Sequence, residues 1–291
     1  QSDLLVVGGG SIWPGHTVFQ NVTSLSKKLK IPLFVLGISA KYKPTEKVLK
    51  DNIQLIKYSS LFHVRDLSSY KILDNHPNVT KGTDLFWWSK HCSDELISNY
   101  NIKSVALNLR SWEGNWSPQN IIKVLDNLKL SINSWPLYYG SRVHEAGDYP
   151  TDFELLSDLT RKSLPSSFTL KPLEDSSFSI CMRFHAILIS VRAGRPVIGF
   201  NYHNKTKSFY DENNISELCV DLGDELALNN AILLLENDFD SYICKFDNIR
   251  KKLMSQGNVD RELLNTKLKL IGKRKVSKLL NIKLIIKRLL S

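Results

Sequence analysis

The sequence of 291 residues is 42% apolar and 10% aromatic, which is ample for buried cores and excludes an intrinsically disordered chain. No run of about 18 uninterrupted apolar residues occurs, so we expect no membrane-spanning helix and a cytoplasmic protein. The formal net charge is +10, but residues 267–291 hold nine Lys and Arg without one acid, leaving only +1 for the remainder. This balance argues against a nucleic-acid-binding domain.

Short apolar runs alternate with helical periodicity along the chain, and most of the runs end in Gly, Pro, Asn or Asp. This alternation predicts a doubly wound α/β protein. The expected strands are Leu4–Gly8, Leu33–Gly37, Leu61–Arg65, Ser104–Leu109, Pro136–Gly140, Phe178–Cys181, Pro196–Phe200 and Leu218–Leu222. The expected helices between them include Pro118–Ser131, Thr151–Lys162, Ala186–Ala193 and Glu225–Glu236.

A polar, irregular segment from about Trp88 to Lys103 separates two sets of these units. We therefore expect two Rossmann-like domains with parallel sheets, residues 1–95 and 96–255, and a basic helical tail at 256–291. Because a strand begins almost at once after Gln1, the N-terminal domain is expected to lack its first strand and loop. Ligands of open parallel sheets bind at the carboxyl ends of the strands, so polar residues that follow strands are the candidates.

In the first domain the candidates are the glycines of "VVGGG", where Gly9 and Gly10 offer backbone N–H groups to an anion. A tight turn between strand and helix explains the same glycines, since the sequence lacks the endings of a P-loop or a dinucleotide fingerprint. Asp66 follows the third expected strand, and capping of the next helix is its favoured role. The four cysteines are widely spaced and predict no metal site.

In the second domain Arg110 ends the strand "SVALNL", with Trp112 and Trp116 as candidate stacking surfaces. Asp152 ends a long loop that also holds Arg142, His144 and Asp148, and it either caps a helix or contacts a ligand.

The stretch "ICMRFHAILISVRAGRPVIGF" places Arg183 and His185 between an apolar strand and an apolar helix. A guanidinium beside helix N–H groups suits a phosphate or carboxylate, and an imidazole can transfer protons near neutral pH. Bridging of loops by Arg183 and capping by His185 are the structural alternatives.

The stretch "MRFHAILISVRAGRPVIGFNYHNKTKSF" resembles the closing motif of the polysaccharide pyruvyl transferase family: R-x-H, an apolar helix, G-x-P and Y-x-x-K. Upstream, "VVGGG", "VRDLSSYKIL", "GTDLFW" and "LNLRSW" follow in that family's order. The family usually opens with a strand and a G-N-x-G-D type loop, and an acidic residue usually precedes the R-x-H strand. The sequence has neither feature.

The resemblance implies a two-domain fold similar to GT-B and transfer of pyruvate from phosphoenolpyruvate to a sugar as a ketal, with release of phosphate. It implies catalytic roles for Arg183 and His185 and no metal or other cofactor. Substrate-binding roles follow for Arg110, Lys205, Gly9, Gly10 and Asp152. The acceptor would be a sugar or lipid-linked saccharide of a surface polysaccharide. The alternatives are a GT-B-like sugar-nucleotide glycosyltransferase and a non-catalytic module that binds anionic surfaces.

The basic segment at 267–291 predicts reversible contact with an anionic membrane, because each basic residue near such a surface gains about 1 kcal/mol. A packed terminal helix and a frayed end are the alternatives. Co-sedimentation with anionic vesicles should fall at high salt and after deletion of residues 267–291. Binding that does not depend on the charge of the lipid would contradict the prediction.

Overall fold

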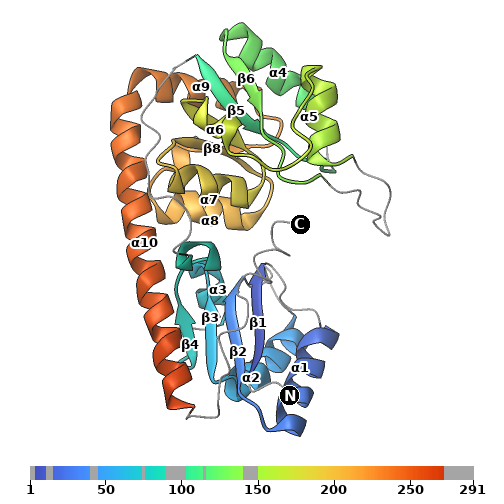
Figure 1. The fold of residues 1–291 in the computed structure, drawn as a ribbon, viewed down its shortest axis with the longest axis vertical. Coiled ribbons are helices and arrows are strands. Elements are labelled where there is room, and N and C mark those ends of the chain that lie inside the picture. The colour runs from blue at the N-terminus through green and yellow to red at the C-terminus, as the bar shows by residue number, and fades with distance from the viewer. Residues whose placement is uncertain are drawn as a thin grey trace. The chain divides into compact units, whose positions relative to one another are not determined.

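The computed structural model describes residues 4–10, 16–39, 45–73, 76–89, 103–113, 116–139 and 150–271. They form two compact units. The N-terminal unit holds residues up to 89 together with 252–271, and the C-terminal unit holds residues 103–251. The long helix α10 (Phe239–Leu270) contributes to both units (Figure 1).

The N-terminal sheet has four parallel strands in the order β1-β2-β3-β4. The strands are β1 (Leu5–Gly10), β2 (Leu33–Ile38), β3 (Leu61–Val64) and β4 (Val79–Lys81). The helices between and after them are α1 (His16–Leu29), α2 (Glu46–Tyr58), α3 (Leu67–Ile72) and the 3-10 helix η1 (Leu85–Trp88). Each crossover between neighbouring strands therefore contains a helix.

The buried side chains of β2 alternate between two cores. Leu33 and Val35 belong to one cluster with Ile56 of α2. Phe34 belongs to the other cluster, where it is joined by Leu264 of α10. Because successive strand residues point to opposite faces of a sheet, the end of α10 supplies the helix that covers the second face.

A buried polar cluster fastens α10 to this sheet. The Asp260 carboxylate, 2% exposed, accepts hydrogen bonds from the Thr83 backbone N–H at 2.7 Å, the Thr83 hydroxyl at 2.8 Å and Gln256 Nε2 at 2.9 Å. His63 Nε2 lies 3.5 Å from Asp260 Oδ2, and His63 Nδ1 accepts from the Gly37 N–H at 3.1 Å. Since Nδ1 is an acceptor, the proton of a neutral His63 ring must be on Nε2, facing the carboxylate.

Burial alone would raise the pKa of Asp260, but the hydrogen bonds from His63, Gln256 and Thr83, together with the coulombic effect of His63, bring it below 3.8. The carboxylate is therefore charged at neutral pH, and its hydrogen bonds are charge-assisted.

Two glycines permit the close approach of α10. A Cβ at Gly257 would lie 2.4 Å from the Trp87 carbonyl oxygen, and one at Gly82 would lie 2.5 Å from each carboxylate oxygen of Asp260. From the sequence, residues 256–291 were expected to form a basic helical tail, with a packed terminal helix as one alternative. Their described part, 256–271, belongs to the N-terminal unit, where its apolar face and Asp260 are buried against the sheet.

The C-terminal sheet has five parallel strands in the order β6-β5-β7-β8-β9. The strands are β5 (Ser104–Asn108), β6 (Ser131–Ser134), β7 (Phe178–Cys181), β8 (Val197–Asn201) and β9 (Cys219–Asp221). The helices of this unit, besides the first part of α10, are α4 (Pro118–Asn127), α5 (Asp152–Thr160), α6 (Lys171–Glu174), α7 (Phe184–Arg192), α8 (Asn204–Glu212), η2 (Ser216–Leu218) and α9 (Glu225–Asn237).

The predicted α/β fold with two parallel sheets is confirmed. The strand expected at Pro136–Gly140 is wrong, because the sheet uses Ser131–Ser134 and residues 136–139 follow that strand as a loop. The strands β4 and β6 were not expected. No helix among the described residues is long and apolar enough to cross a membrane.

Candidate functional site

The C-terminal sheet has a topological switch point between β5 and β7. The chain passes from β5 outward to β6 and then returns to the other side of β5 as β7. The connections that follow β5 and β7 therefore run in opposite directions along the sheet. Ligands of open α/β sheets bind at the carboxyl ends of the strands at such a switch point. Arg110 follows β5 and Arg183 follows β7, so both lie at that edge.

Asn108 joins the ends of three strands at this edge. It is the last residue of β5 and is fully buried. Its Nδ2 donates to the Trp135 carbonyl oxygen, after β6, at 2.8 Å, and its Oδ1 accepts from the Arg183 N–H, after β7, at 3.0 Å. The start of α7 is thereby fixed relative to the ends of β5 and β6.

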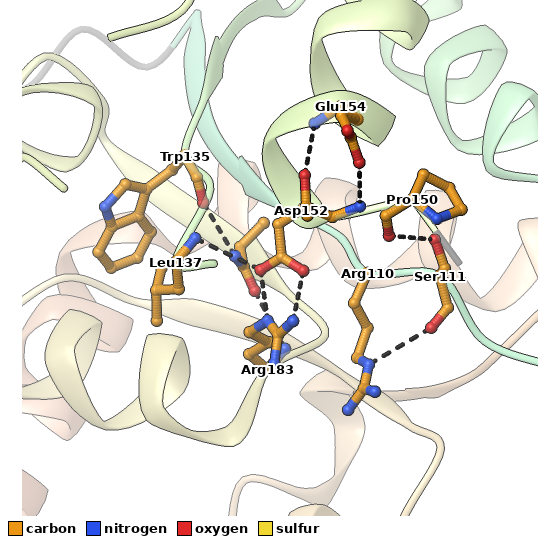
Figure 2. Close-up of polar contacts among 10 residues, drawn as sticks. Arg110, Ser111, Trp135, Leu137, Pro150, Asp152, Glu154 and Arg183 are labelled. Carbon is orange, nitrogen blue, oxygen red and sulfur yellow. Dashed lines mark hydrogen bonds and ion pairs between the residues drawn. The ribbon is translucent and has the colours of Figure 1, made fainter. Parts of the chain in front are cut away.

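Arg183 and Asp152 form an ion pair in which the carboxylate is buried (Figure 2). Arg183 Nη2 donates to Asp152 Oδ1 at 2.5 Å, Arg183 Nε donates to Asp152 Oδ2, and the Leu137 N–H donates to the same oxygen at 3.3 Å. The Arg183 side chain is 17% exposed and that of Asp152 is 1% exposed. This two-point contact is the geometry in which guanidinium and carboxylate bind most strongly.

This pair bears on the expected roles of both residues. Arg183 was predicted to bind a substrate anion, but the carboxylate of Asp152 already occupies two of its donors. Asp152 was expected to cap a helix or contact substrate. The cap of α5 is instead Thr151, which forms a capping box with Glu154, and Asp152 is the first residue of the helix.

His185 and Lys205 both lie near the Phe184 ring. His185, half-buried, is the second residue of α7, and its ring centroid is 6.4 Å from that of Phe184. Lys205 is the second residue of α8, and its Nζ is 5.5 Å from the centroid of the Phe184 ring. Side chains two apart at a helix start do not share a face, so Arg183 and His185 point in different directions.

Arg110 lies against two aromatic rings. Its guanidinium carbon is 5.1 Å from the Trp112 ring centroid and 5.9 Å from that of Tyr202, which follows β8. The two rings meet edge to face at 4.9 Å. In Figure 2 Arg110 is seen to contact Ser111 rather than Asp152.

Two further groups near this edge keep their protons at neutral pH. Burial, and then the charge of Asp152, raise the pKa of Tyr139 above its ordinary value of 10.0. Burial raises the pKa of the Cys181 thiol to about 12. Neither group therefore ionises by itself at neutral pH.

Gly9 and Gly10 belong to the N-terminal unit, where they end β1. Their φ values of 77° and 83° are in the region that glycine favours. Gly10 pairs with Ile38, and its carbonyl accepts from the Ser39 N–H at 3.1 Å. The other predicted site residues belong to the C-terminal unit and are Arg110, Asp152, Arg183, His185 and Lys205.

No family model matches the sequence, and no curated protein does. Among solved structures, HepE from Anabaena, in complex with UDP and glucose, matches with 11% identity and a TM-score of 0.54 over 91% of this chain and 77% of its own. TarM matches with 13% identity and a TM-score of 0.54 over 92% of this chain and 54% of its own, so this chain spans about half of TarM. Both have the GT-B fold.

The fold is similar to GT-B. Within this GT-B-like fold, the sequence pointed to Arg110, Arg183 and Lys205 as candidates but not to Asn108, which holds the start of α7. The sequence does not single out Asn108, because an asparagine at a strand end is common, and it indicates Tyr202 only as part of the Y-x-x-K motif.

Capping by Asp66 in the N-terminal unit is confirmed, since its Oδ1 accepts from the Ser69 N–H at 2.7 Å. The candidates that lie outside the described residues are Arg142, His144 and Asp148.

Proposed function

We propose that this protein transfers a group from a phosphorylated donor to a saccharide acceptor. The observation that carries the proposal is the gathering of Arg110, His185 and Lys205 at one edge of the C-terminal sheet, after three different strands. Cations there suit a phosphate, and an imidazole can accept or donate the proton that a hydroxyl acceptor loses.

The first donor class is a sugar nucleotide. Two observations support it: the GT-B-like fold and the aromatic rings of Trp112 and Tyr202 beside Arg110. In this reaction an acceptor hydroxyl bonds to the anomeric carbon, the bond from that carbon to phosphate oxygen breaks, and the nucleotide leaves with its electron pair. His185 would take the hydroxyl proton, and Arg110 and Lys205 would stabilise the charge on the departing phosphate.

The second donor is phosphoenolpyruvate, and the R-x-H motif with its following G-x-P and Y-x-x-K supports it. The enol carbon gains a proton, one sugar hydroxyl bonds to the neighbouring carbon, phosphate leaves, and a second hydroxyl closes the ketal. Because Arg183 is paired with Asp152, Arg110 and Lys205 become the principal anion-binding cations in this reading as well.

Ligand-dependent stability and product analysis together test the proposal. A ligand at 100 times its Kd stabilises the folded protein by about 2.7 kcal/mol, which raises the thermal unfolding midpoint measurably. Protection by a sugar nucleotide with release of nucleotide supports glycosyl transfer. Protection by phosphoenolpyruvate with release of phosphate supports pyruvyl transfer. If neither donor protects the protein and neither product forms, the proposal is wrong. That result would favour the alternative of a non-catalytic module that binds anionic surfaces.

His185 offers the clearest catalytic test, because its imidazole is the group of this site that exchanges protons near neutral pH. Replacement of His185 with alanine should lower turnover of the donor by about two orders of magnitude or more, the usual effect of losing a general acid or base. His76→Ala is the matched control, since His76 lies in the N-terminal unit, partly exposed. Normal turnover by a folded His185→Ala protein would show that His185 is not the general acid or base.

A further inference from the structure

Trp112 is a large aromatic residue that is 40% exposed at the edge of the sheet where the candidate residues gather. Its indole is nevertheless held in place. The Tyr202 ring meets it at 4.9 Å with an interplanar angle of 77°, and the Arg110 guanidinium carbon lies 5.1 Å from its centroid. The Trp112 carbonyl also accepts a hydrogen bond from Trp116 Nε1 at 3.2 Å.

The two rings approach each other from different strands. Trp112 follows β5 and Tyr202 follows β8, and these strands are the two neighbours of β7. The rings therefore meet beyond the carboxyl end of β7, where α7 begins with Arg183 and His185. Arg110, which is near both rings, brings a positive charge to the same place.

We propose that Trp112, Tyr202 and Arg110 bind the nucleoside diphosphate part of the donor, with the base stacked on Trp112 and a phosphate on Arg110. The inference rests on the proposed sugar-nucleotide transfer and names the residues that would recognise its donor. Every nucleobase has a π-face that stacks on an indole, and a guanidinium suits phosphate oxygens. Because Tyr202 and Arg110 already hold the indole, little side-chain freedom is lost when the base binds.

Calorimetric titration of the whole chain with UDP, GDP, ADP and dTDP, and separately with pyrophosphate, tests the inference. Replacement of Trp112 with alanine should weaken binding of the preferred nucleotide about tenfold to hundredfold, the range for loss of one stacked base. Pyrophosphate binding should not change. Trp112→Phe should retain most of the affinity for the nucleotide. Arg110→Ala should weaken the binding of both the nucleotide and pyrophosphate.

Phe168→Ala is the matched control, because Phe168 is 42% exposed, like Trp112, and belongs to the same unit. It should leave the affinity for both ligands unchanged. Since the Trp112 side chain is itself partly exposed, its alanine variant should fold normally, and equal thermal midpoints check this.

Two results would overturn the inference, and they differ in what they say about the proposed function. If the wild-type protein binds a nucleotide and Trp112→Ala lowers nucleotide and pyrophosphate affinity equally, or lowers neither, base stacking on Trp112 is wrong while glycosyl transfer stands. If the wild-type protein binds phosphoenolpyruvate but no nucleotide, the inference and the sugar-nucleotide donor are both wrong, and pyruvyl transfer remains.

Discussion

Replacement of Arg183 with alanine should destabilise the C-terminal unit by about 3–5 kcal/mol, the range for breaking a buried ion pair by removal of one partner. Among the described residues, the Leu137 N–H would be the remaining hydrogen-bond partner of the Asp152 carboxylate, whose side chain is 1% exposed in the wild-type protein. Asp152→Ala should lower the stability of this unit by less, because the Arg183 side chain is 17% exposed and its charge can reach water. Native-state hydrogen exchange of residues 150–160 and 178–192 measures both effects within this unit.

The exposed ion pair between Lys171 and Asp175 of the same unit provides the matched control. Its atoms are 2.7 Å apart, but the two side chains are 67% and 48% exposed. Lys171→Ala should therefore change stability little, since solvent screens such pairs. If Arg183→Ala is no more destabilised than Lys171→Ala, the pair between Arg183 and Asp152 does not form as described.

This expectation affects how activity measurements on Arg183 are interpreted. From the sequence, Arg183 was assigned to a substrate anion, so a loss of turnover in Arg183→Ala would have been taken as loss of that contact. The ion pair provides a second cause, because Asp152 also holds the Leu137 N–H at the base of the loop after β6. His185 and Arg110 are therefore better positions at which to separate catalysis and binding from stability.

The sequence predicted the strand β7 and the start of α7 well, because an apolar run ended in two polar residues and a second apolar run followed. It did not predict that Arg183 would pair with Asp152. The two residues are 31 positions apart, and each was judged by its own neighbours in the chain. Local patterns describe the strands and helices, whereas pairing between side chains depends on how the strands are ordered in the sheet.

The same limit explains the missed strands and the end of α10. The strands β4 and β6 have three and four residues, and their single clearly apolar residues, Val79 and Ile132, are too few for an alternating pattern. In α10 the polar run "SQGNVDRE" gave no sign of burial, although Gly257 and Asp260 approach the N-terminal sheet closely. A buried aspartate is recognised only once its partners, His63 and Thr83, are known.

Replacement of Asp260 with alanine should destabilise the N-terminal unit by about 3–5 kcal/mol at pH 7. The change removes three charge-assisted hydrogen bonds and leaves the Thr83 N–H buried without its acceptor, and a buried group of this kind costs about 1–3 kcal/mol. Hydrogen exchange of β3 and of residues 252–270 measures the loss. Gln256→Ala is the milder comparison, because it removes only one of the three hydrogen bonds.

The dependence of this loss on pH distinguishes the charge of Asp260 from the space that its side chain fills. The pKa of Asp260 is lowered in the folded protein, so its stabilising effect is fully present above the unfolded value of about 3.9 and is lost as the pH falls through the lower folded value. The difference in stability between the wild-type protein and Asp260→Asn should therefore be largest near neutral pH and should shrink below about pH 4. Because the amide oxygen of the Asp260→Asn variant can still accept from the His63 Nε2–H, Asp260→Ala is measured over the same range. A difference that stayed constant from pH 7 to pH 3 in both variants would show that the charge of Asp260 does not hold α10 against the sheet.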